Sequence, residues 1–115
     1  MKSFLEFKTV SVSISGDYYQ IMFDDGLDAE GEPYFLIQGE SGIEDDGFRY
    51  FESHIECLIG HYIPKSASLS TSSLHISYGE KQHQDVEIRF GLHKTDFHEL
   101  ASVLMEIIPE TRIER

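Results

Sequence analysis

Apolar and polar residues alternate with a period of two in several segments of this chain, and the period becomes helical only near its end. Val10, Val12 and Ile14 alternate with serines, which indicates a half-buried strand. Ser15-Gly16-Asp17 supplies turn residues, and the alternating run that follows predicts the returning strand of a hairpin. The clearest alternation is Val86-Glu87-Ile88-Arg89-Phe90, whose charged residues are expected to face solvent. Strands linked by hairpins are therefore the main constraint on the fold.

An amphipathic helix is predicted after the last strand. We expect Thr95 to cap its N-terminus, and Pro109 to end it. Between them, apolar residues recur at spacings of three and four, at Phe97, Leu100, Ala101, Leu104, Ile107 and Ile108. The predicted fold class is α+β, an antiparallel sheet of about six to seven hairpin-linked strands with one C-terminal amphipathic helix packed on one face.

The length of 115 residues suits a single domain, 1–115, and the 40% of hydrophobic residues suffice for one core. Tyr34-Phe35-Leu36-Ile37-Gln38 is apolar on both faces, so we expect it at the centre of the sheet. Residues 56–73 mix an apolar patch, Pro64 and a serine-rich run. There we predict an irregular link followed by a strand near Ser66–Ser70.

Negative charge is concentrated in one third of the chain. Of 21 acids, ten lie between Thr9 and Phe48, a stretch without Lys or Arg in a chain of net charge −12. Such a field attracts basic partners and repels nucleic acid and anionic membranes, although solvated loops without a partner are the alternative. The residues predicted to bind a partner are eight acids of this stretch and two aromatics, namely Asp24, Asp25, Asp28, Glu30, Glu32, Glu44, Asp45, Asp46, Tyr34 and Tyr50. Tyr18 and Phe48 are further aromatic candidates, and burial in the sheet is the alternative for all four rings.

Patterns typical of catalysis or metal binding are not found in the sequence. There is no Gly-x-Ser-x-Gly elbow and no Gly-Lys-Ser or Gly-Lys-Thr phosphate loop. The six histidines show neither a helical i, i+4 pair nor zinc-finger spacing with Cys57, and the acids from Asp28 onward do not fit a calcium loop. Cys57 lies among Ile55, Leu58 and Ile59, so we expect a buried, inert thiol. We therefore predict that the protein is not an enzyme and holds no cofactor or metal.

Segments spread over nearly the whole chain follow a recognisable order. They are Phe7-Lys8-Thr9-Val10, Pro33-Tyr34-Phe35-Leu36-Ile37-Gln38, Tyr50-Phe51-Glu52, Val86-Glu87-Ile88-Arg89-Phe90 and the helix with Leu100, Leu104 and Ile107. This order resembles the immunity protein 10 family of bacterial polymorphic-toxin systems. The resemblance implies a small cytoplasmic protein that binds a cognate toxin and neutralises it. Many delivered toxin domains act on nucleic acid through basic clefts, which an acidic protein can occupy.

The leading functional hypothesis is a non-enzymatic immunity protein that binds a basic toxin domain, either through its acidic loops or through a sheet face. It would bind no nucleic acid and no membrane, and the sequence indicates no oligomeric state. A lone cysteine and the lack of a long apolar segment favour the cytoplasm. The alternatives are a small-ligand or metal-binding domain, an acidic nucleic-acid mimic unrelated to toxins, and an enzyme of unrecognised type.

Overall fold

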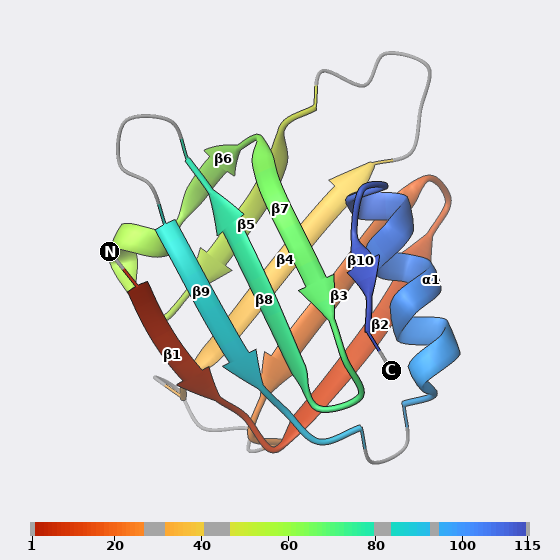
Figure 1. Ribbon diagram of the computed structural model, residues 1–115, viewed down its shortest axis with the longest axis horizontal. Coiled ribbons are helices and arrows are strands. Elements are labelled where there is room, and N and C mark those ends of the chain that lie inside the picture. Colours follow the sequence, from red (N-terminus) through yellow and green to blue (C-terminus); the bar gives the residue numbers. More distant parts are fainter. Residues whose placement is uncertain (1, 27–31, 41–46, 80–83, 93–94, 115) are drawn as a thin grey trace.

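The computed structural model describes residues 2–26, 32–40, 47–79, 84–92 and 95–114. Within these ranges the chain forms ten strands, one α-helix and one 3-10 turn (Figure 1). The α+β class predicted from the sequence is confirmed. The strands, however, are divided between two sheets that pack face to face, where one sheet was expected.

The first sheet, which we call the meander sheet, contains five strands in sequence order, each antiparallel to its neighbour. They are β2 (Thr9–Ser15), β3 (Tyr18–Asp24), β4 (Tyr34–Glu40), β5 (Arg49–Ser53) and β6 (Gly60–Tyr62). Gly16 opens the tight β2–β3 turn with a φ of +60°, a conformation that glycine adopts without steric cost. β4 lies at the centre of this sheet, as its apolar sequence predicts.

The second sheet, which we call the mixed sheet, has the order β1-β9-β8-β7-β10. Its strands are β1 (Lys2–Glu6), β7 (Pro64–Leu69), β8 (Ser73–Tyr78), β9 (Gln84–Arg89) and β10 (Arg112–Ile113). The central strands are antiparallel, whereas both edge strands pair in parallel, β1 with β9 and β10 with β7. The two ends of the described chain therefore form the two edges of this sheet.

The helix α1 (Phe97–Ile107) begins one residue later than a Thr95 cap would place it. Asp96 is the N-cap, and its Oδ1 accepts a hydrogen bond from the His98 backbone N–H at 2.7 Å. Thr95 was expected in that role, but its hydroxyl donates instead to the Val10 carbonyl at 2.6 Å. Thr95 therefore fastens the start of the helix to β2.

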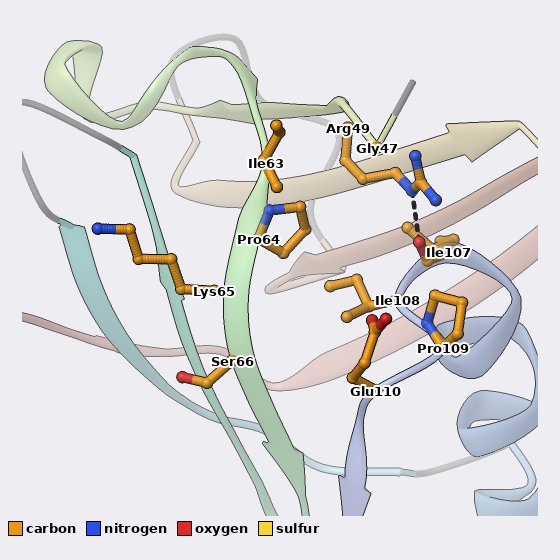
Figure 2. A pocket seen from close by; sticks show the side chains of 10 residues that line it. All are labelled: Gly47, Arg49, Ile63, Pro64, Lys65, Ser66, Ile107, Ile108, Pro109 and Glu110. Atoms are coloured by element: carbon orange, nitrogen blue, oxygen red, sulfur yellow. Dashed lines mark hydrogen bonds between the residues drawn. The ribbon is translucent and has the colours of Figure 1, made fainter. Parts of the chain in front are cut away.

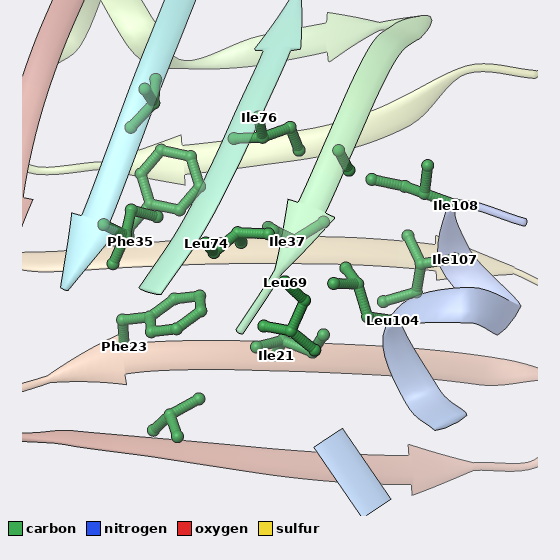
Figure 3. Packing of buried hydrophobic residues seen from close by; sticks show 14 of the residues in the cluster. Ile21, Phe23, Phe35, Ile37, Leu69, Leu74, Ile76, Leu104, Ile107 and Ile108 are labelled. Atoms are coloured by element: carbon green, nitrogen blue, oxygen red, sulfur yellow. The ribbon is translucent and has the colours of Figure 1, made fainter. Parts of the chain in front are cut away.

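The core lies between the two sheets and α1. The ring of Phe51 from the meander sheet stacks on Tyr78 from the mixed sheet, with centroids 3.9 Å apart and planes 3° from parallel. Of the predicted helix stripe, Leu100, Leu104, Ile107 and Ile108 are buried, whereas Phe97 and Ala101 are partly buried. Figure 3 shows Leu104 and Ile107 beside the meander-sheet core. The mixed sheet and α1, which contacts β2, β3 and β4, together cover the inner face of the meander sheet (Figure 1). No described element covers its outer face.

The link between β5 and β6 corrects one prediction. The 3-10 turn η1 (Glu56–Leu58) buries Leu58 completely but leaves Cys57 exposed. A 3-10 helix has about three residues per turn, so successive side chains point in different directions. The apolar neighbours of Cys57 in the sequence therefore do not enclose it, and the predicted buried thiol is wrong.

Candidate protein-binding face

The outer face of the meander sheet is defined by the side chains that alternate away from the core. Strand register brings together Ser11 and Ser13 on β2, Tyr18, Gln20, Met22 and Asp24 on β3, Tyr34, Leu36, Gln38 and Glu40 on β4, Tyr50 and Glu52 on β5, and His61 on β6. Among these described residues there are three carboxylates and no Lys or Arg. The face thus combines uncompensated negative charge with large rings.

Two tyrosines on this face share one carboxylate. The Tyr34 hydroxyl donates to Glu52 Oε2 at 2.9 Å, and the Tyr50 hydroxyl donates to Glu52 Oε1 at 2.6 Å. Burial and then this hydrogen bond raise the pKa of Tyr34, while for Tyr50 the hydrogen bond to Glu52 is the largest cause of a raised pKa. Both phenols consequently remain donors at neutral pH, and both rings are held in fixed orientations. Fixed aromatic side chains lose little entropy when a partner covers them.

The backbone of Tyr34 is also held in place, by the side chains of Ser53 and His54. His54 Nδ1 lies 3.1 Å from both the Tyr34 N–H and the Tyr34 carbonyl, and the Ser53 hydroxyl donates to that carbonyl at 3.0 Å. The next row of the face is also paired, because Gln38 Nε2 donates to Gln20 Oε1 at 2.7 Å. The centre of the face is therefore a preorganised surface rather than a set of loose side chains.

Two of the predicted binding acids are used within the fold. Asp24 Oδ1 accepts from the Thr9 hydroxyl and from the Gly26 N–H, both at 2.9 Å. Asp25 Oδ1 accepts from the Lys8 N–H at 3.0 Å. These bonds stabilise the end of the β2–β3 pair, so both carboxylates already accept hydrogen bonds within the fold.

The remaining predicted acids divide between two places. Glu32 is half-buried just before β4, whereas Asp28, Glu30, Glu44, Asp45 and Asp46 lie outside the described residues. The chain segments that carry them leave from opposite ends of β4, one before Tyr34 and one after Glu40. A seven-residue strand is roughly 20 Å long. The described residues next to these two segments, Glu32 and Glu40, therefore lie toward opposite ends of β4.

A hollow occupies one end of this face. We call it the Tyr18 cavity; it measures about 420 Å³ and is lined by Tyr18, Gln38, Gly39, Glu40, Phe48, Tyr50 and His61. The Tyr50 and His61 rings lie 4.9 Å apart across β5 and β6. Tyr18 and Phe48 are exposed, while Tyr34 and Tyr50 are half-buried, so none of the four candidate rings belongs to the core.

A second hollow, the Arg49 cavity, lies at the C-terminal end of α1 and measures about 400 Å³ (Figure 2). Arg49 is buried on the core side of β5, and its Nε donates to the Ile107 carbonyl. A cation is favourable there because the helix C-terminus carries partial negative charge. Gly39 permits this approach, since a Cβ at that position would lie 2.8 Å from Ile107 and 3.1 Å from Arg49. This cavity contains a structural arginine that sequence reasoning did not single out.

No constellation for metal chemistry is present in the part of the chain that the structure describes, where no three His, Cys, Asp or Glu side chains gather as ligands. His61, His75 and His98 lie on β6, β8 and α1, and His54 lies between β5 and η1, while His83 and His93 fall outside the described residues. Among the described residues, no helix is both long and apolar enough to cross a bilayer.

No family model matches the chain, and neither a curated protein nor a solved structure is significantly similar to it. The resemblance to the immunity protein 10 family therefore stays a prediction.

Proposed function

We propose that this chain is a non-enzymatic protein-binding module whose outer meander face engages a basic protein, and that this partner is a bacterial toxin domain that the chain neutralises. The observation that carries the proposal is the outer face itself. Two of its rings, Tyr34 and Tyr50, are fixed by the shared Glu52 carboxylate, and its described residues include no Lys or Arg. The toxin as the partner rests on the resemblance noted in the sequence.

A rigid sheet face suits inhibition by occlusion. Aromatic side chains that are already ordered can supply the buried anchors of an interface, because such residues dominate binding energy. The surrounding acids would steer a basic partner toward the face and speed the encounter. No bond needs to be made or broken, so the proposed role requires no catalytic group.

The face can be tested with one matched pair of substitutions. Met22 lies in the middle of the outer meander face, between Ser11 and Leu36, whereas His75 is exposed on the outer face of the mixed sheet. Met22→Arg and His75→Arg each add one arginine at a solvent-facing strand position. The candidate partner is the toxin-like C-terminal domain of a secreted protein encoded next to this chain, and calorimetry of the purified pair measures affinity.

We expect Met22→Arg to weaken binding at least about tenfold, which corresponds to about 1.4 kcal/mol. His75→Arg should leave the affinity within about twofold, because it lies outside the proposed interface. Circular dichroism and thermal unfolding verify that both variants are folded. Equal loss of affinity in the two variants, or loss only in His75→Arg, would place the interface elsewhere.

A further inference from the structure

The Tyr18 cavity collects exposed aromatic surface in one place. Tyr18 is 53% exposed and Phe48 is 47% exposed, and both line this one hollow at the end of the outer meander face. Large exposed apolar groups that gather at a concave site mark binding surfaces more often than scattered ones do. A volume of about 420 Å³ falls within the range of ligand-binding pockets.

The charge of the cavity indicates the kind of group that fits it. Glu40 is exposed and contributes a carboxylate, and Gln38 contributes a side-chain amide. The described residues that line the cavity include no Lys or Arg. Aromatic rings carry negative potential on their faces, so rings and carboxylate together favour a cation over an anion or a neutral chain.

The aromatic lining of the cavity favours binding of a guanidinium group over binding of an ammonium group. A guanidinium is planar and weakly hydrated, stacks on aromatic rings, and donates to a carboxylate through two parallel N–H groups. The Tyr50 and His61 rings, 4.9 Å apart and inclined by 43°, both line the cavity, as do the exposed Tyr18 and Phe48. An ammonium is a compact, strongly hydrated charge and gains less from such a surface.

We infer that the Tyr18 cavity is a socket for an arginine side chain of the protein partner, held by Tyr18 and Tyr50 and by the Glu40 carboxylate. This inference rests on the proposed function, because it names the anchor that the partner inserts into the same face. The Arg49 cavity is an internal contrast of nearly equal volume. Its lining contains Arg49 and Lys65 with one carboxylate, Glu110, so a further cation is less favourable there than in the Tyr18 cavity.

The socket can be tested without the partner. The probe is a capped tetra-arginine peptide, compared with tetralysine and tetraglutamate peptides, and binding is followed by two-dimensional NMR of the isotope-labelled protein. Tyr18→Ser and Glu40→Gln remove the ring and the charge at exposed positions, which keeps the fold intact. Tyr18→Phe is the matched control because it retains the aromatic ring, and the backbone signals of the Arg49 cavity provide a second reference.

We expect tetra-arginine to shift the signals of Tyr18, Tyr50 and His61 and to bind more tightly than tetralysine, with tetraglutamate inactive. Tyr18→Ser and Glu40→Gln should each weaken tetra-arginine binding by about threefold, the size expected for one exposed cation–π contact or charge pair, and Tyr18→Phe by less than about twofold. Equal binding of the two basic peptides, shifts outside the cavity, or no effect of Tyr18→Ser would overturn the socket.

The two proposals fail separately. If the peptide result is negative while Met22→Arg still prevents partner binding, the face is correct and the anchor is wrong. If tetra-arginine binds in the cavity while Met22→Arg leaves partner affinity unchanged, the socket exists and the proposed interface is wrong.

Discussion

The two outer faces of this sandwich carry similar numbers of acids but differ in the cations that lie beside them. The described strands of the mixed sheet present Glu6, Asp85 and Glu87 outward together with Lys2, Arg89 and Arg112. Register places Lys2 opposite Asp85 and Glu6 opposite Arg89, so opposite charges are neighbours. The strands of the meander sheet present Asp24, Glu40 and Glu52, with no outward cation among the described residues.

The two faces differ in whether their acids are accompanied by cations. Acids beside cations serve solubility, whereas acids without cations are available for recognition. A surface with alternating signs produces little field beyond itself, whereas acids without cations project a field that a basic partner can follow. On the meander face the acids are also combined with ordered rings, and Glu52 fixes two of them. The mixed face has serines and a histidine at the corresponding outward positions of β8.

The largest expected effect tests whether the two faces belong to one folding unit. Phe51→Ala removes the ring that stacks on Tyr78 across the sheets, and truncation of a buried Phe costs about 3–5 kcal/mol. We expect a lower free energy of unfolding and a single transition, because the core is shared. Denaturant unfolding followed by fluorescence and by circular dichroism measures both. Two separate transitions would mean that the sheets, and hence their faces, are independent.

The next prediction compares equal changes in charge on different parts of the surface. Asp28, Glu30 and Glu32 can be replaced together by Asn and Gln, as can Glu44, Asp45 and Asp46, and Glu6, Asp85 and Glu87 on the mixed face. Each set raises the net charge equally and spares Asp24 and Asp25, which are bonded within the fold. The mixed-face set includes Asp85, which accepts from the Ser77 hydroxyl, so thermal unfolding verifies that this variant is folded.

We expect either loop set to lower the association rate for the partner several-fold at low salt, and the mixed-face set to change it little. The difference should shrink as salt shortens the Debye length from about 10 Å at 0.1 M to about 3 Å at 1 M. Stopped-flow binding across a salt series measures the rates. Equal slowing by all three sets would show that total charge, and not the meander side, governs the encounter.

A smaller effect is expected from Glu52→Gln, which changes the meander face alone. Burial is the largest cause of the raised pKa of Tyr34 and the hydrogen bond to Glu52 that of Tyr50, and the Glu52 charge raises both pKa values further. In Glu52→Gln this charge is lost, so both pKa values should fall toward the ordinary value near 10, while the effect of burial remains. A tyrosine whose pKa is raised by folding stabilises the fold below its unfolded pKa, and this contribution disappears as pH rises through the folded pKa. An absorbance titration of tyrosinate should therefore begin at lower pH in the variant. An unchanged titration would mean that Glu52 does not control the two rings.

The smallest effect is expected on the mixed face. Glu6 is exposed opposite Arg89, and exposed charge pairs contribute about 0–1 kcal/mol. Glu6→Gln should therefore change the free energy of unfolding by less than about 1 kcal/mol and leave partner affinity unchanged. Chemical denaturation and calorimetry measure the two quantities. A clear loss of affinity would extend the interface to the mixed sheet and remove the contrast between the faces.

Local features of the fold were readable from the sequence. The β2–β3 hairpin, the central β4 and the strand β9 follow from short-range alternation and turn residues, and α1 follows from its 3.6-residue stripe. The division into two sheets and the parallel edge strands were not predicted. They depend on pairings such as Lys2 with Asp85, which no local period encodes.

The candidate face was only partly predictable. Tyr50 and Glu52, two residues apart on one strand, must share a side of the sheet, so their pairing was accessible from the sequence. Tyr34 reaches the same carboxylate only because β4 and β5 pair with Leu36 opposite Glu52, and that register is a tertiary property. The Thr95 cap was wrong for a similar reason, since β2 competes for its hydroxyl.

The pairing of distant strands in the mixed sheet has a consequence for the order of assembly during synthesis. Every strand pair of the meander sheet joins neighbours in sequence. In the mixed sheet, by contrast, β1 can pair only after β9 has been synthesised, and β7 gains its second partner only when β10 has been synthesised. Pairing of close segments closes short loops and is fast, while pairing of distant segments is slow. We therefore expect the register of the binding face to be set while the C-terminal third is still on the ribosome. The helix α1 would then pack on a sheet whose register already exists.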